Sequence, residues 1–392
     1  MRPVPYYVLA LALSLPAALV GVEIPTFLLL GTRTLSLQSD FRVFYTPAYM
    51  LRTHQQSEIY DFSSIRRNQD LRVAPDNGAV PFLHPAYEAV LFIPLSLLPY
   101  RVAYIAWAGI NLLVLASIYF LLRPRLENLR ALGPGWISPA LLLGFFPVAF
   151  AILAGQDSLL LLLATVSGLR RISKSEFQAG LLLGLGMFRF QVLLPIILLF
   201  IFWRCFNFVL GWLVSSAAVL GASAIITGVG AQVQYAKLLL QMGAFSYWPL
   251  LRRMPNLRGL FLSAGFEKLP LLVVSVAIVF TTVVIGMKQN SEQRLVLAIT
   301  MSCLVTYFLF MHDLSLLALP ILLAMDAAAF RMDWRQLALI AAVPLLFAVF
   351  WFATDRFYLG ALFTSLFLVV KLMSPKNNHC DASSDRRRGW LR

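Results

Sequence analysis

The sequence predicts an all-α protein, a polytopic transmembrane helical bundle of about 11–12 membrane segments. Of its 392 residues, 60% are hydrophobic and 13% are charged, and the mean hydropathy is +0.78. A soluble domain of this length needs far more charged surface, so lipid must be the solvent for most of the chain. A membrane-spanning helix needs about 20 apolar residues, and stretches near that length follow one another along the sequence.

The first apolar stretch, residues 6–30, is longer than the apolar part of a signal peptide, so we expect an uncleaved first span with a cytoplasmic N-terminus. A polar loop follows over residues 31–80, and a second polar segment occupies 232–259. We expect residues 1–373 to form one transmembrane domain and 374–392 a basic, disordered cytoplasmic tail. The other apolar stretches are 82–99, 102–122, 137–153, 159–169, 177–203, 208–226, 269–287, 295–310, 314–330, 337–352 and 357–373.

Four short basic loops set the expected orientation, because lysines and arginines accumulate in cytoplasmic loops. This rule predicts a multi-pass protein of the cell (inner) membrane with all four loops and the tail in the cytoplasm. The same loops, together with anionic headgroups, account for the net charge of +14 without nucleic acid as a partner. The loops contain Arg123, Arg125 and Arg130; Arg170, Arg171 and Lys174; Lys288 and Arg294; and Arg331 and Arg335.

This orientation requires residues 82–99 and 177–203 to be re-entrant or broken, the second of them near Arg189. If both instead cross the bilayer as plain spans, the loop at Arg123 lies outside. In the first orientation, the polar residues within the apolar segments collect on the extracytoplasmic face. An active site at the membrane surface would show such a distribution.

Residues 41–51 carry aromatic and apolar side chains at helical spacing. They predict an amphipathic helix in the first external loop, with its aromatic residues in the headgroup layer. Asp40 stands at the start of that helix. Its carboxylate is expected to cap the helix, and it could also take a proton from a substrate hydroxyl.

Three further polar positions interrupt the apolar stretches. His84 and Glu88 lie one helical turn apart and could bind a polar headgroup or pair with each other. Residues 155–158, Gly-Gln-Asp-Ser, are typical of a tight turn, with Asp157 or Ser158 capping the next helix. Arg189 is surrounded by apolar residues, where a charge costs at least about 2.5 kcal/mol, so it needs an acidic partner or an anionic ligand.

Two more candidate segments carry charge near the membrane boundary. Arg252, Arg253 and Arg258 alternate with aromatic residues, a pattern that suits phosphate binding and also ordinary snorkelling at the interface. His312 and Asp313 join two apolar stretches. A helix cap explains Asp313, whereas it does not explain His312.

Taken together, these segments resemble glycosyltransferase family 87, GT-C-type membrane enzymes related to phosphatidylinositol-mannoside mannosyltransferases. The family usually has Lys-Pro-Gln where this chain has Arg189-Phe190-Gln191, and often a proline at the position of Ala86. The matching pieces occur in order at residues 40–45 with 60–61, 82–85 with 94–95, 155–158, 180–191, 254–259 and 312–314.

The resemblance implies inverting transfer of a hexose, with mannose as the expected sugar, from a polyprenyl-phosphate donor to an extracytoplasmic glycan or glycolipid acceptor. Asp40 would be the general base, and Arg189, Arg252, Arg253, Arg258 and His312 would stabilise the departing phosphate. No metal or cofactor is implied, and the partners are membrane lipids, donor and acceptor. The expected substrate-binding residues are His84, Glu88, Gln156, Asp157, Arg189, Gln191, Arg252, Arg253, Arg258, His312 and Asp313.

A polytopic transporter or flippase is the alternative function. Transporters often contain internal repeats with broken helices at equivalent positions of the two halves. No such repeat is recognisable here, and the polar residues favour one face over the midplane. Motif order therefore favours the transferase.

Overall fold

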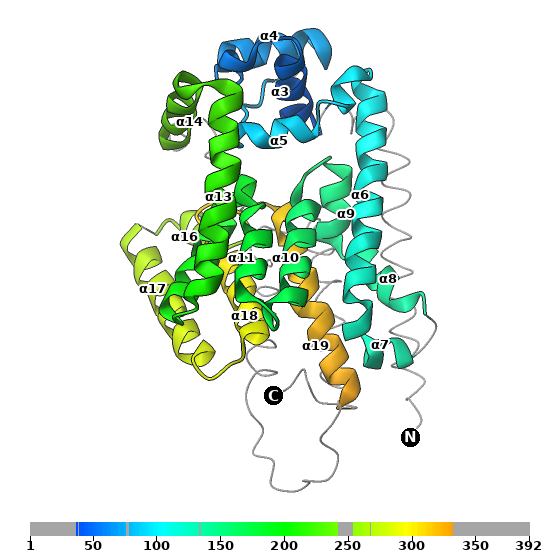
Figure 1. The fold of residues 1–392 in the computed structure, drawn as a ribbon, viewed down its shortest axis with the longest axis vertical. Helices are drawn as coiled ribbons and strands as arrows, with labels where there is room; N and C mark the ends of the chain where they lie inside the picture. Colours follow the sequence, from blue (N-terminus) through cyan, green and yellow to red (C-terminus); the bar gives the residue numbers. More distant parts are fainter. Residues whose placement is uncertain are drawn as a thin grey trace, which may run out of the picture.

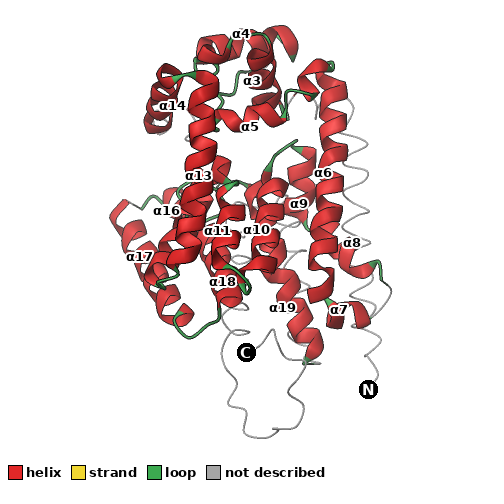
Figure 2. Cartoon of the chain, in the orientation of Figure 1, coloured by secondary structure: helices red, strands yellow, loops and turns green. Residues whose placement is uncertain are grey.

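The computed structural model describes residues 37, 39–75, 78–132, 135–241, 254–266 and 268–331. Every regular element within these ranges is a helix, which confirms the all-α prediction for this part of the chain (Figure 2). The predicted spans at 6–30, 337–352 and 357–373 lie outside the described residues. So do Arg252, Arg253, Arg335 and the predicted tail.

A layer of short helices forms a cap at one end of the molecule, drawn at the top of Figure 1. Asp61 begins one of these helices, α4, and its carboxylate accepts a hydrogen bond from the backbone N–H of Ser64. The cap consists of α3 (Arg42–Arg52), η1 (Gln56–Glu58), α4 (Phe62–Arg72), α5 (Ala86–Leu91), η2 (Leu95–Leu97) and α14 (Val229–Gln241).

A helical bundle lies beneath the cap, and the long helices α6 and α13 run from the cap to the opposite end (Figure 1). Its large apolar core is built from side chains of most of these helices. The bundle comprises α6 (Tyr100–Leu122), η3 (Arg123–Arg125), α7 (Glu127–Ala131), α8 (Ile137–Leu143), α9 (Phe146–Leu153), α10 (Ser158–Ile172), α11 (Glu176–Gly184), η4 (Met187–Arg189), α12 (Phe190–Phe202), α13 (Phe206–Thr227), α16 (Leu257–Ser263), α17 (Lys268–Gly286), α18 (Ser291–Val305), η5 (Met311–Leu317) and α19 (Ala318–Phe330).

Within the described residues, four helical segments are long and apolar enough to cross a membrane, or five if one bent pair is counted as a span. They differ in position: 89% of Met311–Phe330 is buried inside the bundle, against 11% of Lys268–Gly286, whose apolar side chains are left to face lipid. The four segments are Tyr100–Arg125, Phe206–Thr227, Lys268–Gly286 and Met311–Phe330.

The predicted number of membrane segments is therefore too high for the described part of the chain. The stretch at 137–153 is divided into two short helices, α8 and α9, by a break at Gly144 and Phe145. Helices α10 and α18 have 15 residues each. At 1.5 Å per residue this is about 22 Å, short of the roughly 30 Å of a hydrocarbon core.

Both stretches predicted to be re-entrant or broken are interrupted in the structure. Residues 82–99 contain only α5 and η2, neither of which could cross a bilayer. Helices α11 and α12 are bent by 71° at the break before Met187. Glu176, at the start of this pair, accepts a hydrogen bond from Ser291, and Cys205, just after its end, contacts Arg294. Both ends of the pair thus lie near residues 290–294, in agreement with a segment that folds back near Arg189.

Three of the basic loops, together with Arg331 at the described start of the fourth, lie toward the end of the bundle opposite the cap (Figure 1). Arg125 donates two hydrogen bonds, of 2.5 and 2.7 Å, to the carboxylate of Glu292, which also accepts one from Ser173. Asp326, near the fourth loop, accepts hydrogen bonds from Asn128 and from the backbone of residue 129. The loops therefore share one face of the protein, as the positive-inside rule requires.

Helix α3 confirms the predicted helix after Asp40, but two of its three aromatic side chains pack against protein. Phe44 and Tyr45 are buried in protein, where Phe44 stacks on Phe92 and Tyr45 packs against Tyr100. The aromatic face thus covers α5, η2 and the start of α6. Phe44 and Tyr45, which the sequence pattern assigned to the lipid headgroups, therefore pack against other parts of the protein.

Helices α11 and α13 approach each other until their backbones touch. A Cβ atom on Gly211 of α13 would lie 2.0 Å from the carbonyl oxygen of Phe177, and one on Gly180 of α11 would lie 2.0 Å from that of Phe208. Small residues allow such close packing between membrane helices. This contact fixes α11, and with it the break that carries Arg189.

Replacing Gly211 with alanine should lower the melting temperature of the protein, because the added methyl group would force the two helices apart. Overpacking of this kind costs about 1–3 kcal/mol. Gly221, also on α13, is the matched control, since nothing lies within 4 Å of its Cβ position. Thermal unfolding in detergent measures both variants, and equal melting temperatures for G211A and G221A would contradict this packing.

Candidate active site

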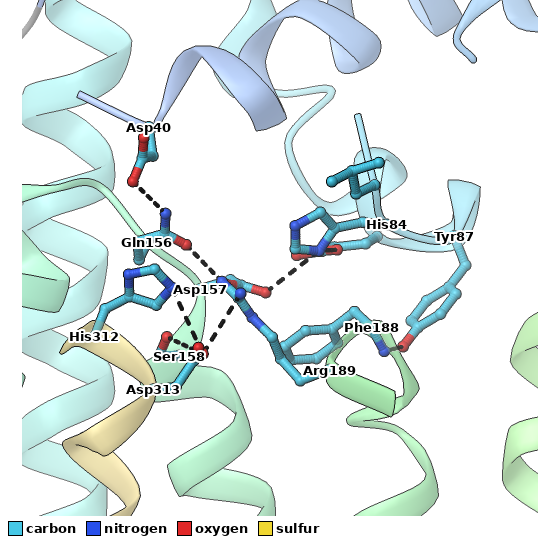
Figure 3. Close-up of polar contacts among 12 residues, drawn as sticks. Asp40, His84, Tyr87, Gln156, Asp157, Ser158, Phe188, Arg189, His312 and Asp313 are labelled. Carbon is cyan, nitrogen blue, oxygen red and sulfur yellow. Dashed lines mark hydrogen bonds and ion pairs between the residues drawn. The ribbon is translucent and has the colours of Figure 1, made fainter. Parts of the chain in front are cut away.

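A cluster of buried polar side chains lies where the cap meets the bundle (Figure 3). Its members come from the segment just before α3, from the start of α5 and the segment just before it, from the turn between α9 and α10, from η4 and from η5. Most of these positions are at a helix end or a break in a helix. The cluster consists of Asp40, His84, Glu88, Gln156, Asp157, Arg189, His312 and Asp313.

Arg189 is the centre of this cluster and is only 5% exposed. Its guanidinium forms a close ion pair with Asp157, with an Nε–Oδ1 distance of 3.1 Å. It also donates a hydrogen bond of 2.5 Å to Gln156 Oε1 and lies 3.5 Å from Asp313 Oδ1. The acidic partner that the sequence required for Arg189 is therefore present twice.

Gln156 connects Arg189 to Asp40 (Figure 3). Its side-chain Nε2 donates a hydrogen bond of 2.7 Å to Asp40 Oδ2, while its side-chain oxygen Oε1 accepts a hydrogen bond from Arg189. Asp40 does not cap α3, whose N-cap position is Phe41 without a side-chain hydrogen bond. The expected cap is wrong because the carboxylate of Asp40 turns toward the α9–α10 turn instead.

The α9–α10 turn brings Gln156 to Asp40 because Gly155 adopts a left-handed conformation, with φ of +66°. A Cβ atom on Gly155 would lie 2.7 Å from the Cβ of Phe41, so only glycine lets the two segments approach this closely. From α6, Trp107 donates to the carbonyl of Gly155 and Asn111 to that of Gln156. This support was not predicted, although an amide at position 111 of an apolar helix is a recognisable sign of it.

Asp157 occupies the N-cap position of α10, but its carboxylate makes no cap hydrogen bond. The cap expected from Asp157 or Ser158 is absent because the Asp157 carboxylate pairs with Arg189, and Ser158 Oγ lies 3.5 Å from Asp313 Oδ1. The tight turn itself is confirmed. Both side chains contact members of the cluster instead, and these contacts join the turn to η4 and η5.

His84 and Glu88 pair with each other, which is one of the two alternatives that the sequence left open, with 2.7 Å between His84 Nδ1 and Glu88 Oε2. The imidazole lies between the rings of Phe44 and Phe82. Burial lowers the pKa of His84 to about 3, and the nearby charge of Arg189 acts in the same direction. Burial, followed by the negative charge of Asp157, raises the pKa of Glu88 well above its ordinary value.

Asp313 and His312 belong to η5 and close the cluster from below in Figure 3. Asp313 Oδ2 accepts a hydrogen bond of 2.9 Å from the backbone N–H of Phe310, so the expected capping role is confirmed. Its other oxygen faces Arg189 and lies 3.6 Å from His312 Nε2. His312 is thus buried beside the ion pairs.

The break at η4 is held by Tyr87, which the sequence analysis did not single out. Its hydroxyl donates a hydrogen bond to the carbonyl of Leu185 and accepts one from the N–H of Phe188 (Figure 3). These contacts satisfy backbone groups that the break leaves free. They also fix Arg189 relative to α5.

Two of the predicted substrate-binding residues make other contacts. Arg258 donates a hydrogen bond to the backbone carbonyl of Tyr307. Its guanidinium carbon also lies 3.5 Å from the centre of the Tyr307 ring and 4.8 Å from the centre of the Phe308 ring. Gln191 uses its backbone carbonyl to accept a hydrogen bond from Thr306. The remaining two, Arg252 and Arg253, lie outside the described residues.

The sequence model of glycosyltransferase family 87 matches residues 82–320, more than half of the chain. The chain belongs to glycosyltransferase family 87. The match includes every member of the polar cluster except Asp40. No curated protein and no solved structure matches the chain.

Membership of family 87 identifies the protein as a membrane glycosyltransferase and decides against the transporter alternative. The matched range contains the turn with Gln156 and Asp157, the break with Arg189, and the η5 residues. Because Asp40 precedes that range, the case for it rests on its contact with Gln156. The cluster is therefore the candidate active site of a family 87 glycosyltransferase.

Replacing Arg189 with glutamine should destabilise the protein strongly, because Asp157 and Asp313 would keep buried charges without their cation. Removing one partner of a buried ion pair typically costs about 3–5 kcal/mol. The matched control is Arg67→Gln, whose pair with Glu58 is solvent-exposed and worth about 0–1 kcal/mol. If thermal unfolding gave both variants the wild-type melting temperature, the ion pairs described here would not exist.

Proposed function

We propose that this protein transfers a hexose, with mannose as the favoured sugar, from a polyprenyl-phosphate donor to a glycan or glycolipid acceptor with inversion at the anomeric carbon. The observation that carries the proposal is the contact between Asp40 and Gln156. It holds a carboxylate at the mouth of a buried cluster, where an acceptor hydroxyl can meet it. Inversion needs one such carboxylate, since the leaving group departs from the opposite face of the sugar.

In this mechanism Asp40 accepts the proton of the acceptor hydroxyl as its oxygen attacks C1 of the sugar. The bond between C1 and the phosphate oxygen breaks, and polyprenyl phosphate leaves with the bonding electrons. The side chain of Asp40 is partly exposed, whereas Gln156 and Asp157 are buried. Asp40 is thus the carboxylate of the cluster that a substrate can reach from the cap side.

Gln156 and Arg189 position the base in this proposal. The Gln156 amide can donate to Asp40 only in one orientation, and Arg189 selects that orientation by binding the amide oxygen. A base held within hydrogen-bond reach of its proton supplies about 10²–10⁴-fold of rate acceleration. Arg189 is already paired with Asp157 and Asp313, so we assign it to positioning more than to phosphate binding.

The departing phosphate needs positive charge rather than an acid, because phosphate monoesters are good leaving groups. His312, buried beside Asp313, is the candidate within the cluster for donating a hydrogen bond to the departing phosphate. Arg252, Arg253 and Arg258 stay candidates for the donor phosphate, and Arg258 already presents its guanidinium beside two aromatic rings. Cations among aromatic residues suit a lipid phosphate at the membrane boundary.

We propose further that the cap and the active site face the extracytoplasmic side of the cell membrane. Three basic loops and Arg331, the described start of the fourth, lie at the opposite end of the bundle (Figure 1), where the positive-inside rule expects the cytoplasm. Polyprenyl-linked sugars and an external acceptor would then meet at the cap.

Asp40→Asn should abolish transfer while donor binding is kept, because an amide cannot take the acceptor proton. We expect a loss of about 10²–10⁴-fold in kcat. Membranes holding the variant are incubated with radiolabelled polyprenyl-phosphate mannose, and label in the acceptor is counted. Glu58→Gln changes an exposed carboxylate of the same cap and should transfer normally. Full activity in D40N would remove the proposed base.

Gln156→Leu should lower kcat with little change in the KM for the donor, because Asp40 would lose the group that holds it. Misplacement of a catalytic group by about 1 Å can cost about 10²-fold. Steady-state kinetics at varied donor concentration separate the two constants. A raised donor KM with unchanged kcat would mean that Gln156 binds the donor instead.

A further inference from the structure

We propose that His84, Glu88 and Asp157 bind a divalent transition-metal cation, of the Mn²⁺ or Zn²⁺ type, beside the transfer site. Its role rests on the proposed function, in that the cation would face the donor phosphate. The sequence-based expectation was that no metal is needed. Glu88 belongs to α5, His84 lies two residues before that helix, and Asp157 lies in the α9–α10 turn, so no short sequence motif contains all three ligands.

The three side chains offer their ligand atoms to one another across a small space. One ligand atom from each residue lies within 4.8 Å of the other two. Metal–ligand bonds of about 2.1 Å place neighbouring ligands of a tetrahedral ion about 3.4 Å apart. The separations of 2.7 Å and 3.9 Å from His84 Nδ1 to Glu88 and Asp157 lie on either side of that value, so shifts of roughly 0.5–0.7 Å would seat an ion. One imidazole nitrogen with two carboxylates suits Zn²⁺ and Mn²⁺.

The ligand atoms are also buried, and within the described residues they face one another rather than other hydrogen-bond donors. His84 Nδ1 lies 2.7 Å from Glu88 Oε2 and 3.9 Å from Asp157 Oδ2, and these atoms, with Glu88 Oε1, have no hydrogen bond to a residue outside this group. Glu88 and Asp157 are fully buried and His84 is 8% exposed. Buried polar atoms nearly always have partners, and one atom from each of the three residues lies within 4.8 Å of the other two. A bound cation would satisfy all of them together.

Arg189 does not occupy the same position. It binds Oδ1 of Asp157, whereas Oδ2 faces His84 Nδ1 at 3.9 Å. The two oxygens of this carboxylate are thus divided between the guanidinium and the proposed ion. The rings of Phe44 and Phe82 hold the imidazole of His84 in place, with Nδ1 toward Glu88.

The charges of the site supply the physical reason for a cation. Within the cluster as the structure describes it, four carboxyl groups, those of Asp40, Glu88, Asp157 and Asp313, stand against one guanidinium, that of Arg189. A phosphate entering such a site meets net negative charge. Protonation of Glu88 would remove one negative charge but bring no positive one. A divalent cation offsets two carboxylates and attracts the phosphate.

Metal binding by the full-length protein in lipid nanodiscs tests the proposal. After treatment with a chelator, the protein is dialysed against Mn²⁺ in one arm and Zn²⁺ in the other, and bound metal is counted per chain. We expect one equivalent in at least one arm, and at least about tenfold weaker binding in Glu88→Gln and His84→Asn. Glu58→Gln is the control carboxylate and should bind like the wild type.

Pulsed electron paramagnetic resonance of the Mn²⁺-loaded wild type gives a second readout that needs no variant. One directly coupled nitrogen is expected, from His84, because the other two ligands are oxygens. Chelation should lower sugar transfer by at least tenfold, with recovery on adding the bound metal.

The proposal is overturned if the wild type binds no more metal than Glu88→Gln, or if bound Mn²⁺ shows no nitrogen coupling. Because metal is counted without donor, a protein that binds one equivalent but transfers no sugar refutes the proposed function and leaves the metal site standing. If transfer instead persists unchanged with a chelator and without bound metal, the metal proposal is refuted and the proposed function stands.

Discussion

The buried charge of Arg189 is the constraint on which the site depends. A guanidinium inside an apolar bundle is tolerated only if its charge is neutralised and its donors are bonded. Asp157, Asp313 and Gln156 supply those partners from the α9–α10 turn and from η5. Three breaks in helical structure are thereby tied to one side chain, and their geometry becomes mutually dependent.

The same ion pairs limit what Arg189 can do in catalysis. Its charge is neutralised by the carboxylates of Asp157 and Asp313, so Arg189 holds the α9–α10 turn in place and, through Gln156, orients Asp40. The proposed chemistry divides accordingly. A partly exposed carboxylate on the cap side would take the proton, while His312 would donate a hydrogen bond to the phosphate and the proposed cation would supply positive charge outside the Arg189 pairs.

The sequence was sufficient to predict the helical class, the interruptions near residues 82–99 and 189, and most members of the cluster. These predictions succeed because a charge in an apolar segment is costly and has to be explained. The sequence was insufficient to predict long-range packing. The aromatic residues of α3 could contact either lipid headgroups or protein, and the contacts with Phe92 and Tyr100 show that they pack against protein. The cap assigned to Asp40 failed for the same reason, since Gln156 lies 116 positions away. Apolar length alone also overcounts spans, because α8 and α9 break at Gly144.

The most direct test of this account is a double-mutant cycle on kcat between Asp40→Glu, which keeps a displaced but functional base, and Gln156→Leu. If Gln156 acts by holding the Asp40 carboxylate, the double variant should be about as slow as the slower single variant, because the contact is already lost in each. If the two reductions multiply, the residues act independently, and the connection from Arg189 through Gln156 to the base does not exist.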